Sequence, residues 1–180
     1  MRSTAIPPPT APLTDGVIRV RTRRADDIAA VAEASADPMT QRWLGDGPMD
    51  VIERRTSLAR AEEALRSGRS APLLIADAVT DAPLGVVNLQ FRSDELATIA
   101  YSVFPVARGR GLAARAVALV CEWARGLDVH EVRLEIDPTN TASLRVAGKC
   151  AFDPLDEITD DGKAVFARRL ARAVSRRSAP

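Results

Sequence analysis

Alternating apolar and polar residues, a pattern typical of β-strands, recur along the chain. The pattern predicts strands at residues 17–22, 73–79, 84–91, 97–104, 131–136 and 163–170. Only short polar links separate the strands between residues 73 and 104. We expect these three strands to form an antiparallel meander, because a short link does not let the chain cross over for parallel pairing.

Apolar residues at helical spacing mark four further segments. They predict a short helix after Asp26, a helix from Asp50 to Gly68, a helix from Gly111 to Gly126, and a helix over residues 141–150. Aspartate is a favourable N-cap residue, and glycine commonly follows the last helical turn. The predicted order of elements is β α α β β β α β α β.

The strand, helix and strand at residues 98–136 predict one parallel pair within an otherwise antiparallel sheet. The fold class is therefore α/β, with a mixed and mostly antiparallel sheet. A chain of 180 residues is long enough for one hydrophobic core and short for two ordinary domains. We expect a single domain at residues 16–170, with a flexible proline-rich tail at 1–15 and a basic tail at 171–180.

The charge balance gives no reason to expect a nucleic-acid or membrane partner. There are 25 Lys and Arg residues against 24 Asp and Glu residues, a net charge of +1. No run of about 18 apolar residues and no signal peptide is evident. The two cysteines, Cys121 and Cys150, have neither the density of a disulfide scaffold nor the spacing of a metal site. These features favour a cytoplasmic protein.

The segment VFPVARGRGLAARAVALV, residues 103–120, places two arginines and two glycines at the start of a predicted helix. The first amides of a helix lack intrahelical partners, so they can bind an anion where the backbone is accessible. Gly109 and Gly111 would give that access, and Arg108 and Arg110 would add charge suited to a pyrophosphate. A solvated turn that only caps the helix is the alternative. The spacing is neither that of a nucleotide-hydrolase phosphate loop nor that of a dinucleotide-binding fingerprint.

Residues 108–113, Arg-Gly-Arg-Gly-Leu-Ala, resemble the acyl-CoA motif Gln/Arg-x-x-Gly-x-Gly/Ala of the GCN5-related N-acetyltransferase (GNAT) superfamily. Residues 140–152 resemble the Asn-x-x-Ser…Lys-x-Gly-Phe segment of the branch that acetylates ribosomal-protein N-termini. Residues 42–45, Arg-Trp-Leu-Gly, and Tyr101 extend the similarity over about residues 16–170. The resemblance implies the GNAT fold, in which a single sheet has a splayed parallel pair and helices on both faces.

The resemblance also implies which residues bind acetyl-CoA, the expected cosubstrate. Val103 would pair with the pantetheine, and the pyrophosphate would lie on the amides of Arg108, Gly109, Arg110, Gly111, Leu112 and Ala113. Asn140 and Ser143 would be the catalytic residues. Asn140 would bind the cofactor or the substrate amide, and Ser143 would donate a proton or hydrogen bond to the departing thiolate. The alternatives are that Asn140 only caps the helix and that Ser143 is an ordinary first-turn residue.

The base that deprotonates the amine is not evident from the motif. Related proteins often have a glutamate where Thr98 stands, which leaves Asp94, Glu95 or a chain of waters as candidates. An α-amine of pKa about 8 costs only about 1 kcal/mol to deprotonate at neutral pH, whereas a lysine costs nearly 5 kcal/mol. A weak base therefore favours an α-amine.

We expect an N-acetyltransferase in which a primary amine, from a peptide N-terminus or a small molecule, attacks the thioester directly, without a metal. A non-catalytic acyl-CoA-binding regulatory protein is the alternative, and Thr98 is the main argument for it. Nucleic-acid binding by the basic C-terminal residues is a weaker alternative. A homodimer and a monomer are both compatible with the sequence.

Overall fold

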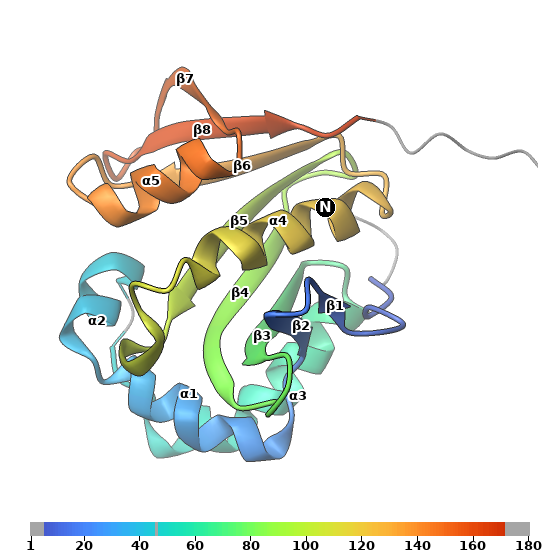
Figure 1. Cartoon of the computed structure of the whole chain (residues 1–180), viewed down its shortest axis with the longest axis vertical. Coiled ribbons are helices and arrows are strands. Elements are labelled where there is room, and N and C mark those ends of the chain that lie inside the picture. The colour runs from blue at the N-terminus through green and yellow to red at the C-terminus, as the bar shows by residue number, and fades with distance from the viewer. Residues whose placement is uncertain (1–5, 46, 172–180) are drawn as a thin grey trace, which may run out of the picture.

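One mixed sheet organises the computed structural model, which describes residues 6–45 and 47–171 (Figure 1). Within these residues eight strands follow the order β1-β2-β3-β4-β5-β6-β8-β7. They are β1 (Leu13–Thr14), β2 (Ile18–Thr22), β3 (Ser70–Asp77), β4 (Pro83–Phe91), β5 (Leu96–Val103), β6 (Glu131–Ile136), β7 (Asp153–Ile158) and β8 (Ala164–Arg169). Neighbouring strands are antiparallel except for the parallel pair β5 and β6. The predicted fold class and the predicted meander are confirmed.

Helices cover both faces of the sheet (Figure 1). They are α1 (Ile28–Ser35), α2 (Pro38–Leu44), α3 (Val51–Arg66), α4 (Leu112–Arg125) and α5 (Thr141–Lys149), with short 3-10 turns at Ala25–Asp27 and Pro105–Ala107. On one face, Val117 and Val120 of α4 belong to the main core together with Val87 of β4. On the other face, Val31 of α1 packs with Leu74 of β3 in a smaller cluster.

The N-terminal residues of the described chain pack against the domain. Ile6 is only 3% exposed, and its amide donates to the Leu65 carbonyl oxygen at 2.9 Å. Leu13–Thr14 forms β1, which pairs with β2. The expected flexible tail is therefore wrong for Ile6 and for Leu13–Thr14. Residues 1–5 and 172–180, the rest of the two predicted tails, lie outside the described residues.

Strands β5 and β6 pair only at their beginnings. The paired residues are Leu96 with Glu131, Ala97 with Val132, and Thr98 with Arg133. Beyond Thr98 the two strands have no further paired residues, which agrees with the splayed pair implied by the family resemblance. Among residues 6–45 and 47–171, no helix is both long and apolar enough to span a membrane.

The splay leaves main-chain groups of β5 unpaired on the β6 side. The Phe104 amide donates to the Leu84 carbonyl oxygen at 2.8 Å. In the antiparallel β4–β5 ladder, this bond identifies which residues of β5 direct their main-chain groups toward β4. Every second residue of β5, including Ser102, directs its amide and carbonyl toward β4. The amides and carbonyls of Tyr101 and Val103 therefore point into the gap between β5 and β6.

Candidate active site

The loop between β5 and α4 presents unpaired amides at a helix start. Gly109 and Gly111 have φ angles of +77° and +73°, values that L-residues rarely adopt. The first helical bond of α4 runs from the Arg115 amide to the Gly111 carbonyl oxygen at 3.5 Å, and no side chain caps this end. The amides of Leu112 and Ala113 therefore have no intrahelical partner.

A cleft of about 500 Å³, here called the loop cleft, lies in front of these amides. Its walls come from β5, α2, α4 and α5. Of the residues predicted to bind the cofactor, it is lined by Val103, Arg108, Gly109, Gly111, Leu112, Ala113, Asn140 and Ser143. Arg110 is not among the lining residues and is exposed on the loop. The structure thus brings together every predicted site residue except Arg110.

The side chain of Arg108 points to α2. Its Nη2 donates to Asp37 Oδ2 at 2.5 Å and to Thr40 Oγ1 at 3.0 Å, and its Nε donates to the Val103 carbonyl oxygen at 3.2 Å. The hydrogen bonds that Asp37 accepts from Arg108 and from the Thr40 amide lower the pKa of Asp37 to about 2. The Arg108 charge is therefore already paired, and the side chain joins the loop to the start of α2.

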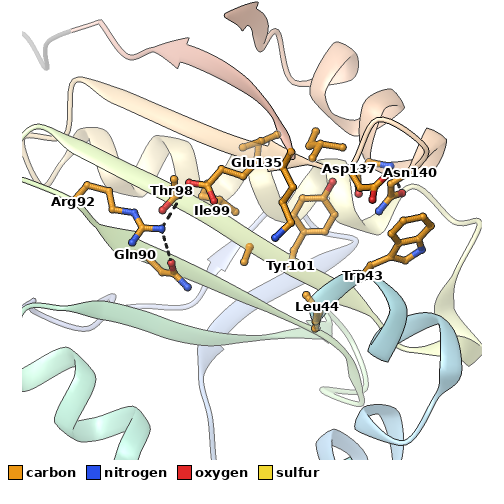
Figure 2. Close-up of a pocket in the computed structure, with 15 residues that line it drawn as sticks. Trp43, Leu44, Gln90, Arg92, Thr98, Ile99, Tyr101, Glu135, Asp137 and Asn140 are labelled. Carbon is orange, nitrogen blue, oxygen red and sulfur yellow. Dashed lines mark hydrogen bonds and ion pairs between the residues drawn. The ribbon is translucent and has the colours of Figure 1, made fainter. Parts of the chain in front are cut away.

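A second cavity of about 260 Å³, here called the sheet pocket, opens where β5 and β6 diverge (Figure 2). In Figure 2, Trp43 and Asn140 lie at one end of it, and Gln90 and Arg92 lie at the other. The sheet pocket and the loop cleft share five lining residues, which we call the junction: Trp43, Leu44, Tyr101, Asn140 and Ser143. A ligand in one cavity can reach a ligand in the other only past these side chains.

Asn140 caps α5 and also lines both cavities. Its Oδ1 accepts a hydrogen bond from the Ser143 amide at 3.1 Å, so it does cap α5. Asn140 and Ser143 also line both cavities. The cap therefore holds both side chains at the junction.

Tyr101 is a junction residue to which the motif analysis assigned no chemistry. Its hydroxyl oxygen is buried and has no hydrogen-bond partner among the residues that the structure describes. Burial raises the pKa of Tyr101 to about 12, and the neighbouring Ser143 offsets only part of this effect. The hydroxyl therefore stays protonated at neutral pH and is available to donate a hydrogen bond.

The carboxylate that faces the sheet pocket comes from β6. Thr98 is only 6% exposed, and its Oγ1 has no hydrogen-bond partner within residues 6–45 and 47–171. The candidates Asp94 and Glu95 do not line the sheet pocket. Glu135 does line it, and its Oε1 lies 3.7 Å from Arg92 Nη2. Glu135 follows Leu134, which belongs to the core on the α4 side of the sheet. The alternation along EVRLEI therefore places Glu135 on the other side of the sheet.

A second acid of the sheet pocket, Asp137, is already occupied. Its Oδ1 accepts from the Thr139 amide at 2.7 Å and from the Thr139 hydroxyl at 2.6 Å. Glu135 is therefore the better placed of the two carboxylates to receive a proton. Glu135 was not predicted from the sequence, because the family motif places the acidic residue on the strand that contains Thr98.

The cysteines do not have the character of nucleophiles. Burial raises the pKa of the Cys121 thiol to about 12 and also raises that of Cys150. Cys150 is 6% exposed, and its Sγ donates to the Ala114 carbonyl oxygen at 3.3 Å. Within the part of the chain that the structure describes, no group of three or more His, Cys, Asp or Glu residues is arranged to hold a metal ion.

Comparison with known families agrees with this geometry. The family model "Acetyltransferase (GNAT) domain" matches residues 18–153, most of the chain. The protein therefore belongs to the GNAT acetyltransferase family. No curated protein matches the sequence significantly.

Solved structures share the fold at low sequence identity. RimL, a ribosomal L7/L12 alpha-N-protein acetyltransferase in complex with coenzyme A, is 18% identical with a TM-score of 0.74, over 88% of this chain and 97% of its own. A spermidine N-acetyltransferase from Vibrio cholerae, in complex with CoA and spermine, is 12% identical with a TM-score of 0.72, over 87% and 96%. An acetyltransferase from Agrobacterium tumefaciens is 20% identical with a TM-score of 0.72, over 88% and 94%.

Proposed function

We propose that the protein is an N-acetyltransferase that uses acetyl-CoA as cosubstrate and acetylates a primary amine. The observation that supports this best is the junction, where the loop cleft and the sheet pocket meet. In this proposal acetyl-CoA occupies the loop cleft, and the acceptor amine enters through the sheet pocket. Family membership and the CoA complexes of two structural neighbours support the same function.

Main-chain groups would hold most of the cosubstrate. The amides from Gly109 to Ala113 would bind the pyrophosphate, because helix-start amides combine free donors with a positive dipole end. The pantetheine would pair with the open edge of β5, where the Val103 amide faces the gap. Arg108 Nε already occupies the Val103 carbonyl oxygen, so the amide is the group that remains for the ligand. An amide aimed at the thioester oxygen would also stabilise the oxyanion formed on attack.

Glu135 of the sheet pocket and Ser143 of the junction would accept and donate the protons. Acetyl-CoA supplies the activated acyl group, and the amine nitrogen attacks its carbonyl carbon. Glu135 would accept the amine proton, directly or through one water, as the C–N bond forms. Ser143 would donate a proton or hydrogen bond to the CoA sulfur as the C–S bond breaks. No covalent acyl-enzyme is needed, which fits the high pKa values of both cysteines.

The acceptor is proposed to be an α-amine of a peptide or protein, or a small-molecule amine. RimL, by its name, acetylates a protein α-amine, and the Vibrio cholerae neighbour acetylates spermidine. Glu135 lines the sheet pocket, and its Oε1 lies 3.7 Å from Arg92 Nη2. An α-amine suits such a site better than lysine, because the α-amine is easier to deprotonate.

Thiol release from acetyl-CoA, measured with a panel of amines, tests the proposal. The panel contains a short peptide, free lysine, spermidine and an aminoglycoside, and CoA binding is measured separately by calorimetry. Turnover with at least one amine supports the transferase. Tight CoA binding without turnover of any amine would favour the regulatory alternative, and no CoA binding would contradict both.

A further inference from the structure

Buried polar atoms that have no hydrogen-bond partner in the described part of the chain lie on the sheet face opposite α4. They include Arg23 Nε, Asn88 Oδ1 and Thr98 Oγ1. The strand register places Asn88 opposite Ala100 on β5 and opposite Pro72 on β3. Unsatisfied buried polar groups are costly and uncommon in folded proteins, so a group of them on one face calls for an explanation.

A cavity of about 530 Å³, here called the helix-side cavity, lies on this face beneath α1, α2 and the start of α3. Along β5, Thr98 and Ala100 line the sheet pocket, and Ser102 and Phe104 line the helix-side cavity. Alternate residues of a strand share a face, so the two cavities follow one another along the same side of β5. Leu44 of α2 lines both of them.

Arg23 lines the helix-side cavity and is not paired with a carboxylate of the described residues. Its Nη1 donates a long hydrogen bond to Ser57 Oγ at 3.5 Å. Burial lowers the pKa of Arg23, and Asp27 only partly opposes this. The Asp27 carboxylate is itself bound by Arg21 at 2.7 and 3.0 Å.

The two acids that line the same cavity cap α3. Asp50 Oδ1 accepts from the Glu53 amide at 2.7 Å, and Glu53 Oε2 accepts from the Asp50 amide at 2.9 Å. These reciprocal bonds form a capping box, which fixes both side chains at the helix start. Neither carboxylate forms an ion pair with Arg23 among the described residues, and Arg23 Nε has no hydrogen-bond partner among them.

We propose that Arg23 binds a carboxylate of the acceptor molecule. An unpaired guanidinium in a partly desolvated site is costly to maintain. Its planar fork of N–H donors matches a carboxylate in two parallel hydrogen bonds. The proposal rests on the proposed function, because it assumes that the acceptor amine is at the junction while the rest of the acceptor extends along β5 into the helix-side cavity.

The spacing of the strands limits which acceptors fit. Arg23 follows Thr22 of β2, and β3 and β4 separate β2 from β5. Three strand spacings amount to roughly 14 Å at the level of the backbone. The arginine side chain and the acceptor together span this distance. A carboxylate several bonds from the amine fits it, such as the side chain of the second residue of a peptide.

Peptide pairs that differ only in Glu or Gln at the second position test the proposal. The variants are Arg23→Gln, Arg23→Lys and, as a matched control, Arg55→Gln, which removes an exposed arginine of α3. In wild type and Arg55→Gln, the KM for the Glu peptide is expected to be lower than the KM for the Gln peptide by about tenfold or more. A charge-assisted hydrogen bond accounts for a difference of this size. Arg23→Gln is expected to abolish this preference, and Arg23→Lys to retain part of it.

A binding experiment without turnover separates this proposal from the proposed function. Glutarate is expected to raise the thermal unfolding midpoint of wild type and Arg55→Gln by about 2 °C or more at saturating concentration, and neutral glutaramide to have no effect. Arg23→Gln should lose the glutarate shift. If no amine is acetylated but this pattern appears, the proposed function fails and the carboxylate site stands.

Two results would overturn the carboxylate site. One is equal KM values for the Glu and Gln peptides in the wild type. The other is a peptide preference or glutarate shift that Arg23→Gln retains. Should Arg23→Gln fail to fold, Arg23→Lys decides the question, because a lysine keeps the charge and loses the fork. An unaltered peptide preference in Arg23→Lys would then count against bidentate binding.

Discussion

Replacing Gly111 with alanine tests how the loop presents its amides. Gly111 is the N-cap of α4 and has a φ of +73°. A Cβ atom at this position would have no heavy atom within 4 Å, so alanine meets no steric obstacle. The cost of the substitution is therefore the backbone strain of an L-residue in the left-handed region, roughly 1–2 kcal/mol.

That strain can lower either of two measurable quantities, the free energy of unfolding or the affinity for CoA. If the loop keeps its conformation, the unfolding free energy falls by about 1–2 kcal/mol, which lowers the unfolding midpoint by roughly 2–8 °C for a domain of this size. If the loop relaxes before CoA binds, the same free energy weakens CoA binding by roughly 5- to 30-fold. We expect the two losses together to sum to about 1–2 kcal/mol. Scanning calorimetry and titration calorimetry with CoA measure them separately.

Gly148 is the matched control. It lies near the end of α5, and a Cβ atom there would also have no heavy atom within 4 Å, but its φ is not positive. Gly148→Ala should stabilise the protein by about 0.5–1 kcal/mol and leave CoA affinity unchanged. Gly111→Asn should recover part of the loss, because asparagine tolerates the left-handed region. A Gly111→Ala protein with wild-type stability and affinity would refute the reasoning.

Three other substitutions test the junction and its support. Ser143→Ala should lower kcat about 100-fold while CoA affinity stays the same; an unchanged kcat in steady-state assays would remove Ser143 from the mechanism. Tyr101→Phe should leave the unfolding midpoint unchanged or raise it, because it removes a buried hydroxyl that has no partner among the described residues, and it should lower kcat severalfold. The pKa of Asp37 is about 2 against an ordinary 3.8, so its stabilisation is complete above pH 3.8 and is lost as the pH falls toward 2. Denaturation at several pH values should show a wild-type advantage over Asp37→Asn that shrinks as the pH falls from 4 to 2; an advantage that stays the same size between these pH values would contradict the Asp37–Arg108 pair.

The strands and long helices could be predicted because their patterns are local. The helix that begins after Gly111 and ends before Gly126 has both its apolar face and its end signals in the sequence. Helix α2 was missed, although Asp37 at its N-cap, Pro38 at its first position and a left-handed Gly45 after its end are recognisable signals. Strand β7 was missed because its residues are mostly exposed and show no alternation.

The cofactor loop could be predicted, but its side-chain contacts could not. Gly109 and Gly111 indicated accessible backbone, and both have the positive φ that this requires. The partner of Arg108 depends on where α2 lies, 68 to 71 residues earlier in the chain, so no local pattern contains it. To identify Glu135, one must know which face of β6 borders the gap between β5 and β6. That depends on how the strands pair, which only the three-dimensional structure shows.

Helix α2 borders all three cavities through Leu44, and Arg108 ties its first turn to the loop in front of α4. Ligands in these cavities would be thermodynamically linked if their binding shifts this one short helix. By reciprocity, an acceptor that tightens CoA binding by shifting α2 must itself bind more tightly, by the same factor, once CoA is bound. Cooperativity between the two substrates would then be a property of α2 and require no contact between them.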